Sequence, residues 1–191
     1  MDFSNNIDDY TSRLKLAIDG IDRKQIDHFA KILLEHYDQG NSIFIFGNGG
    51  SGATASHVVC DFNKGVSLEL EKKFKFICLN DNVGSILAYA NDLAYEEIFC
   101  QQLSNYLTVK DLVIGISGSG NSKNVLKAIE YAKKVGAKTF SLCGYDGGKL
   151  KKIDSVNCIH VAVNDMQIVE DCHMIIFHML MQIIHKFLNK K

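Results

Sequence analysis

The sequence predicts an α/β protein, a three-layer αβα sandwich built on a five-stranded parallel sheet. Short apolar runs rich in β-branched and aromatic residues alternate along the chain with helical patterns such as 122–138, which is typical of a parallel sheet covered on both faces. The length of 191 residues suits one compact domain, 1–191, with a single core. We expect the strands at residues 42–46, 74–79, 111–117, 138–143 and 156–163.

The first 40 residues show apolar spacing near 3.6, which predicts two helices. Gly20 separates the two apolar sets, and Gly40 stops the second one. Residues 1–40 are therefore expected to form an N-terminal helical extension used in packing or oligomerisation.

The chain ends in one long helical pattern that starts at about Val169. Two apolar stripes lie next to each other on it, so its apolar face is wide. A face of this width is expected to pack against something besides its own domain. The stripes are formed by Ile175, Met179, Ile183 and Phe187, and by Cys172, Ile176, Leu180 and Ile184.

The composition excludes several classes of protein. A formal net charge of −1 gives no electrostatic basis for non-specific nucleic-acid binding. The N-terminus lacks the layout of a signal peptide, and no apolar run approaches about 18 residues, so we expect no membrane association. The six cysteines are scattered singly, without a C-x-x-C pair, as in a reducing compartment. We therefore expect a cytoplasmic protein.

Two Gly/Ser-rich segments follow predicted strands and enter predicted helices: 47-GNGGSG-52 and 117-SGSGNS-122. In a parallel sheet both lie at the carboxyl edge, where ligands bind, and helix N-termini attract anions such as phosphate. Tight turns and helix caps would explain either segment alone, but two at one edge favour a ligand. The spacing does not fit a P-loop, and no acidic residue ends the 74–79 run to hold a ribose, so no nucleotide cofactor is expected.

Acids and histidines recur at helical spacing near these segments. His57 and Asp61 are four residues apart, so they share a helix face and could hold one metal ion or act as an acid/base pair. The last helix carries Glu170, Asp171, His173 and His178. Since Glu170 and His178 are about 12 Å apart along the helix axis, both could reach one ion only at near-full stretch or from two copies of the helix. For a site that uses both, we favour a position between subunits.

Taken together, these motifs resemble the sugar isomerase (SIS) domain family, and within it the phosphoheptose isomerases. The resemblance runs from about residue 5 to 188. It rests on the first Gly/Ser segment with His57 and Asp61, the pair 91-ND-92, the second Gly/Ser segment, the sequence 145-YDGG-148, and the acids and histidines of the last helix.

The resemblance implies a function. Members of this kind interconvert sedoheptulose 7-phosphate and D-glycero-D-manno-heptose 7-phosphate through a cis-enediol, as tetramers with sites at subunit interfaces. Asp61 and His178 would be catalytic, and His57, Asp61, Glu170 and His178 would bind zinc or another divalent metal. The phosphate would be held by Ser117, Gly118, Ser119 and Ser122, and other substrate contacts would come from Asn48, Gly49, Gly50, Ser51, Asp61, Asn91, Asp92 and Glu170.

This chain departs from the family pattern at several positions. Asp61 replaces a glutamate, Glu170 replaces a glutamine, and Lys64-Gly65 stands where Gly-Arg is usual. Gln167 and Ile168 replace an Asp and an Arg. Two alternatives therefore stay open: an isomerase for another sugar phosphate, and a non-catalytic SIS module that binds a protein or senses a sugar phosphate. The presence of Asp61 and His178 favours an enzyme.

Overall fold

The sheet has five parallel strands in the order β2-β1-β3-β4-β5. The computed structural model describes residues 2–154 and 157–189. The α/β prediction is confirmed, and each expected strand is present, although Val156 at the start of the last expected run lies outside the described residues. The strands are β1 (Ile43–Gly47), β2 (Phe76–Cys78), β3 (Leu112–Ser117), β4 (Lys138–Cys143) and β5 (Cys158–His160).

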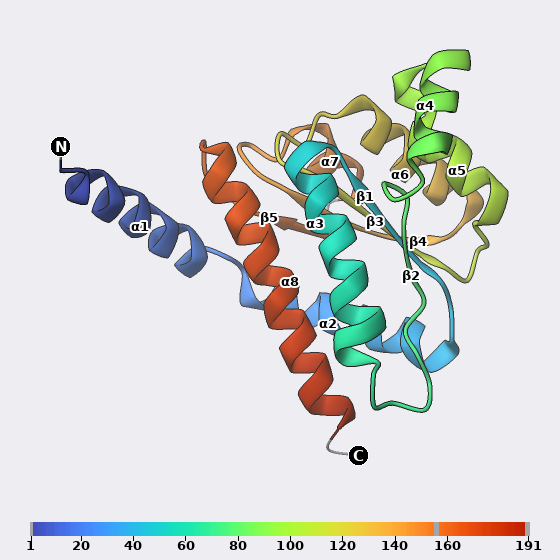
Figure 1. Cartoon of the computed structure of the whole chain (residues 1–191), viewed down its shortest axis with the longest axis horizontal. Coiled ribbons are helices and arrows are strands. Elements are labelled where there is room, and N and C mark those ends of the chain that lie inside the picture. Colours follow the sequence, from blue (N-terminus) through green and yellow to red (C-terminus); the bar gives the residue numbers. More distant parts are fainter. Residues whose placement is uncertain (1, 155–156, 190–191) are drawn as a thin grey trace.

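Helices cover both faces of the sheet, as Figure 1 shows. One face packs against α2 (Arg23–Gln39), α3 (Gly49–Cys60) and the long α8 (Met166–Leu188). The other packs against α5 (Ile98–Tyr106), α6 (Lys123–Val135) and the short α7 (Gly148–Ile153). A π-helix, η1 (Asp61–Val66), continues α3, and a 3₁₀ turn, η2 (Tyr95–Glu97), leads into α5 from the more peripheral α4 (Val83–Asp92).

The core follows from the apolar pattern of the strands. Every residue of β1 and β3 is buried, and alternate side chains enter the two cores on opposite faces of the sheet. On the α2 side, Phe29 stacks on Phe140 of β4 with ring centroids 3.7 Å apart. The side chain of Asp22 caps the start of α2 by accepting from the Lys24 N–H, and Gly40 follows its last residue in the left-handed conformation, the stop that the sequence predicts.

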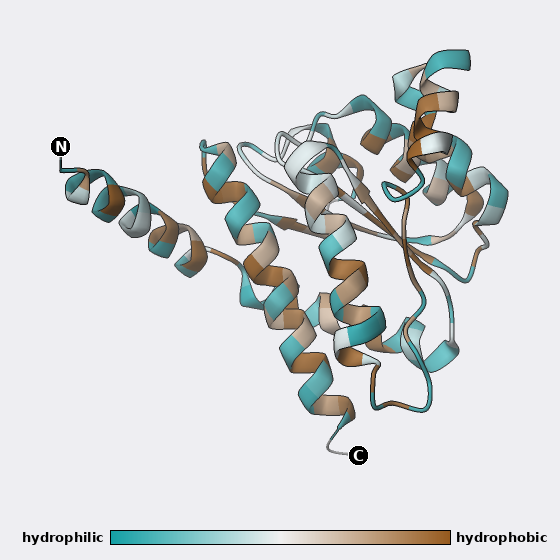
Figure 2. Ribbon diagram, in the orientation of Figure 1, coloured by the Kyte–Doolittle hydropathy of each residue, from teal (hydrophilic) through white to brown (hydrophobic). Residues whose placement is uncertain are grey.

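The N-terminal helix α1 (Ser4–Asp19) projects from the body of the protein (Figure 1). Of its residues only Ala17 is buried, while Ile7 and Leu16 are exposed. Figure 2 shows apolar segments along this projecting helix. Two polar contacts join α1 to the start of α8. The Tyr10 hydroxyl donates to Asp171 of α8 at 2.7 Å, and the Arg13 side chain donates to Asp165, the N-cap residue of α8, at 2.5 Å.

The strand order places a topological switch point between β1 and β3. The chain runs from β1 to β2 on one side and then returns to pair β3 on the other side of β1. In sheets of this kind the crevice at the carboxyl ends of the two central strands is the usual ligand site. Both Gly/Ser segments begin at this point.

The loop between β1 and α3 is shorter than the glycines of the first Gly/Ser segment suggest. Only Asn48 separates β1 from α3, because the helix already begins at Gly49. The last helix likewise begins at Met166, three residues before the expected start, with the Asp165 side chain accepting from the N–H groups of Gln167 and Ile168. No helix in the described ranges has both the length and the apolar character of a membrane span.

Candidate active site

The serine loop, residues 117–122, forms one wall of a cavity of about 250 Å³ at the switch point. Ser117 is buried at the end of β3, and its hydroxyl donates to the Ser122 hydroxyl at 3.1 Å. Among the residues that the structure describes, no lysine or arginine lines the cavity. A bound anion would therefore depend on neutral donors and on backbone N–H groups. The lining residues are Asn48, Gly49, Gly50, Ser51, Ile116, Ser117, Gly118, Ser119, Ser122, Met166 and Glu170.

Asn48 is held on the opposite wall by a reciprocal amide pair. Its Nδ2 donates to Asn124 Oδ1 at 2.8 Å, and Asn124 Nδ2 donates back to Asn48 Oδ1 at 2.9 Å. The Tyr95 hydroxyl also donates to Asn48 Oδ1, at 2.9 Å. Because Asn124 lies on α6, just after the serine loop, this pair fixes the two Gly/Ser segments relative to each other.

The carboxylate of Glu170 lies against the first turn of α3. A Cβ atom on Gly50 would be 2.5 Å from both of its oxygens, so only glycine leaves room for this contact. The free N–H groups and the dipole at a helix N-terminus favour a negative charge in this position. Glu170 therefore places a carboxylate in the cavity opposite the serine loop.

His57, Asp61 and His178 form a compact cluster between α3, η1 and α8. His57 Nε2 lies 3.1 Å from His178 Nε2 and 3.3 Å from Asp61 Oδ2, and His178 Nε2 lies 3.7 Å from the same oxygen. The two histidine side chains are 47% and 46% exposed, and that of Asp61 is 19% exposed. The π-helix begins at Asp61, and such irregular turns are frequent at functional sites.

The donor set of this cluster fits a divalent metal. Ligands about 2.0–2.2 Å from a tetrahedral zinc lie about 3.4 Å from one another, close to the three separations in the cluster. Asp61 Oδ2 is buried and has no hydrogen-bond partner among the described residues, as expected of an oxygen that faces a cation. Two nitrogens and one oxygen leave a coordination position open, which is typical of catalytic rather than structural zinc.

Three further predicted residues lie outside the histidine cluster. Glu170 lines the cavity but is not one of the three residues whose ligand atoms converge in the described chain. Asn91 and Asp92 are exposed at the end of α4, where Asn91 donates to Asp92 at 2.8 Å, and neither is among the described residues that line the cavity. Substrate contacts from these two residues require another copy of the chain or a different arrangement of α4.

His173 points into the core rather than toward the cluster. Its ring is buried, and neither ring nitrogen has a hydrogen-bond partner within the described residues. Burial lowers the pKa of His173 to about 4, and the nearby backbone of Cys143 acts in the opposite direction. His173 is therefore a neutral core residue at neutral pH.

Sequence reasoning missed the side chains that support the cavity. Asn80 bonds to both backbone groups of Gly47, donating to its carbonyl at 2.7 Å and accepting from its N–H at 3.2 Å. Met166 faces Gly118, where a Cβ atom would be 2.4 Å from its sulfur. Asn80 comes soon after the β2 strand, and Asn124 comes just after the serine loop. These positions next to the carboxyl edge of the sheet were the sequence signal that could have indicated both residues.

These features define the class of protein. The SIS domain family matches residues 7–144, and the chain belongs to that family. Its relatives include phosphoheptose isomerases from Helicobacter pylori, 36% identical over 93% of this chain and 91% of the relative, and from Chlorobaculum tepidum, 31% identical over 94% and 87%. The solved structure of a phosphoheptose isomerase from Francisella tularensis matches with a TM-score of 0.88 and 25% identity, covering 97% of this chain and 100% of that one.

Proposed function

We propose that the protein is a phosphoheptose isomerase that converts sedoheptulose 7-phosphate to D-glycero-D-manno-heptose 7-phosphate. The observation that carries this proposal is the pairing of an anion cavity at the switch point with the cluster of His57, Asp61 and His178 on the helices beside it. A phosphate-binding module alone would not need that cluster. Full-length similarity to phosphoheptose isomerases supports the same substrate.

The reaction moves protons between C1 and C2. Removal of a proton from C1 of the ketose and protonation of its C2 carbonyl oxygen give a cis-enediol. Return of a proton to C2 and loss of the hydroxyl proton on O1 then give the aldose. We assign these transfers to Asp61 and His178, whose side chains face each other and are partly exposed to a ligand.

We assign a metal site to His57, Asp61 and His178, with Glu170 as a further candidate ligand. Zinc, when bound, supplies Lewis-acid polarisation of the substrate carbonyl. Among the residues of the chain, Asp61 and His178 exchange protons with the substrate. The serine loop and Asn48 orient the sugar phosphate.

The test is turnover of sedoheptulose 7-phosphate by metal-stripped protein, with and without added zinc, followed by NMR. We expect heptose 7-phosphate to form, with zinc restoring at least tenfold more turnover than the stripped protein shows. Turnover of another phosphosugar, and not of sedoheptulose 7-phosphate, would mean that the family departures at Asp61 and Glu170 fit the pocket to that other substrate. Binding of phosphosugars without turnover of any would contradict an enzymatic role and favour a regulatory module.

We also propose a cytoplasmic homotetramer in which residues 1–40 and α4 contact other copies of this single-domain chain. Support comes from the exposed apolar side chains of Leu16 on α1 and of Val83 and Leu87 on α4, each at least 60% exposed. The six free cysteines are consistent with a reducing compartment. Light scattering should give the mass of four chains, and Leu87→Asp should reduce it; a wild-type monomer would contradict the proposal.

A further inference from the structure

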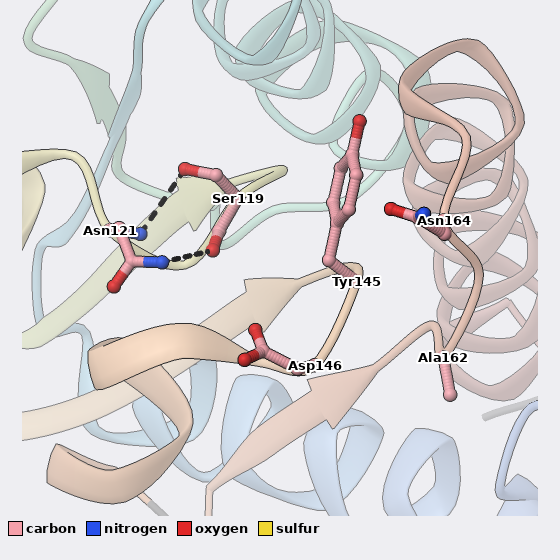
Figure 3. Close-up of a pocket in the computed structure, with 6 residues that line it drawn as sticks. All are labelled: Ser119, Asn121, Tyr145, Asp146, Ala162 and Asn164. Carbon is pink, nitrogen blue, oxygen red and sulfur yellow. Dashed lines mark hydrogen bonds between the residues drawn. The ribbon is translucent and has the colours of Figure 1, made fainter.

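A second cavity adjoins the serine loop on the side of the sequence 145-YDGG-148. It has a volume of about 540 Å³ and shares Ser119 with the anion cavity. Figure 3 shows the ring of Tyr145 standing between Ser119 and Asn164, with its hydroxyl pointing away from Asp146. No hydrogen-bond partner for that hydroxyl occurs in the described part of the chain.

The backbone that carries Tyr145 is interlocked with the serine loop. The Gly144 N–H donates to the Gly118 carbonyl at 2.8 Å, and the Leu150 N–H donates to the Gly120 carbonyl at 2.9 Å. A Cβ atom on Gly120 would be 2.2 Å from the carbonyl oxygen of Gly147, so the two loops touch through their backbones. Any residue at position 145 therefore has a fixed position relative to Ser119.

Tyr145 adopts a backbone conformation that few non-glycine residues accept. Its φ of 51° is positive, which among the described residues holds for no other non-glycine residue. Two contacts maintain it: its N–H donates to the Val163 carbonyl at 3.1 Å, and its carbonyl lies 2.9 Å from His160 Nε2. Residues with such strained backbone conformations cluster at active sites, ligand-binding sites and switch regions.

His160 is set up to donate to that carbonyl. Its other ring nitrogen, Nδ1, lies 3.0 Å from the ammonium of Lys151, which can only donate. Nδ1 must therefore accept, so the proton is on Nε2 and points at the Tyr145 carbonyl. Lys151 thus fixes the tautomer of His160, and His160 fixes the backbone of Tyr145.

We propose that the Tyr145 hydroxyl donates to the substrate phosphate held by Ser119, and that His160 is the positioning residue for Tyr145. Neither cavity is lined by a lysine or arginine of the described ranges, and each includes a carboxylate, Glu170 in one and Asp146 in the other. A phosphate dianion bound there depends on every neutral donor, and an unused hydroxyl beside Ser119 supplies one. This assignment rests on the proposed function, because it deepens the phosphate subsite of the same reaction.

The test is Tyr145→Phe, which removes one oxygen atom and keeps the ring. We expect the KM for the sugar phosphate and the inhibition constant of inorganic phosphate each to rise about tenfold, with kcat changed less than twofold. Values of both constants within twofold of wild type would overturn the role of Tyr145.

Two variants test the positioning role of His160. His160→Leu removes the donor to the Tyr145 carbonyl and should raise KM as Tyr145→Phe does, whereas His160→Gln keeps an amide N–H donor and should restore a KM within threefold of wild type. The double variant Tyr145→Phe with His160→Leu should be no worse than either single variant. A wild-type KM for His160→Leu would contradict positioning.

If His160→Leu does not fold, Tyr145→Gly tests the loss of binding without a loss of stability. Glycine accepts the positive φ without strain, so the thermal midpoint should not fall, while the loss of the hydroxyl should still raise KM about tenfold. A wild-type KM for this variant would overturn the proposal.

Calorimetry with inorganic phosphate distinguishes this inference from the proposed function. Weaker phosphate binding by Tyr145→Phe supports the inference even if wild type turns over no sugar phosphate, an outcome that would remove only the isomerase. Equal phosphate binding by wild type and variant would remove the inference even if wild type is an active isomerase.

Discussion

The serine loop and the cluster of His57, Asp61 and His178 are built by opposite means. The loop is positioned by backbone contacts, with Gly120 pressed against Gly147 and no charged side chain offered to the ligand. The cluster consists of side chains from α3, η1 and α8 that a ligand can approach, with both histidines about half exposed. The stability of the loop should therefore be sensitive to substitutions that add atoms. The activity of the cluster should be sensitive to substitutions that remove a functional group.

The largest expected effect on activity is that of His178→Gln. Loss of an acid/base group should lower kcat about 10²- to 10⁴-fold, while the thermal midpoint stays within a few degrees because the side chain is half exposed. Circular dichroism and steady-state kinetics measure the two quantities. His185→Gln, on the same helix and exposed, is the matched control and should keep wild-type turnover. Near-normal turnover of His178→Gln would remove it from the chemistry.

A pair of glycine substitutions contrasts the two Gly/Ser segments. Gly49 and Gly120 both have positive φ, at 52° and 64°, but a Cβ atom on Gly49 would touch nothing within 4 Å. Gly49→Ala should cost about 1 kcal/mol of unfolding free energy from backbone strain alone. Gly120→Ala adds a backbone clash and should cost about 3 kcal/mol or more. Urea denaturation measures both; equal losses would mean that the serine loop is not interlocked with its neighbour.

The buried ring of His173 makes the stability of the fold depend on pH. Its pKa of about 4 lies below the value of about 6.5 in the unfolded chain, so the unfolded state binds its proton first as the pH falls. The associated stability, about 3 kcal/mol, is fully present above pH 6.5 and is lost between about pH 6.5 and 4.

His173→Met should remove this part of the acid destabilisation. Denaturation curves at pH 7 and pH 4.5 should differ less for the variant than for wild type. Parallel losses in the two proteins would show that His173 does not contribute to acid sensitivity.

A smaller effect is expected when hydroxyls are removed from the serine loop. Ser119→Ala with Ser122→Ala should raise the KM for a phosphorylated sugar about tenfold and leave kcat nearly unchanged, since two neutral donors are lost. Within the loop, Ser119→Ala also removes the acceptor of the Asn121 N–H, a contact of 3.2 Å. Ser104→Ala, on the exposed side of α5, is the control. Unchanged kinetics of the double variant would remove the phosphate role of the loop.

The sheet and both Gly/Ser segments could be predicted because short β-branched and aromatic runs and glycine-rich turns are local signals. The early start of α3 could not, because four glycines in six residues indicate a loop, and it is the packing of Gly52 against Asn80 that accompanies the helical turn. The contacts of Asn48 with Asn124 and of Gly50 with Glu170 join residues 76 and 120 positions apart. No spacing rule within one helix or strand reports on such pairs.

The separation of Glu170 from the histidine cluster shows which part of the site can be predicted from helix geometry. Eight residues on α8 place Glu170 about 12 Å from His178 along the axis, and within the described residues the two carboxylates of the site take different partners. Periodicity thus predicts the distance, but the choice of Gly50 as the partner of Glu170 depends on the three-dimensional fold.

The most direct test of proton transfer by this site is deuterium uptake at C2 of the product, measured by NMR during turnover of sedoheptulose 7-phosphate in D₂O. An enediol route through Asp61 and His178 predicts heptose 7-phosphate that carries deuterium at C2, formed by wild type and lost together with turnover in His178→Gln. Product formed at the wild-type rate without deuterium at C2 would contradict the account, because a proton carried by these two partly exposed side chains would exchange with the solvent.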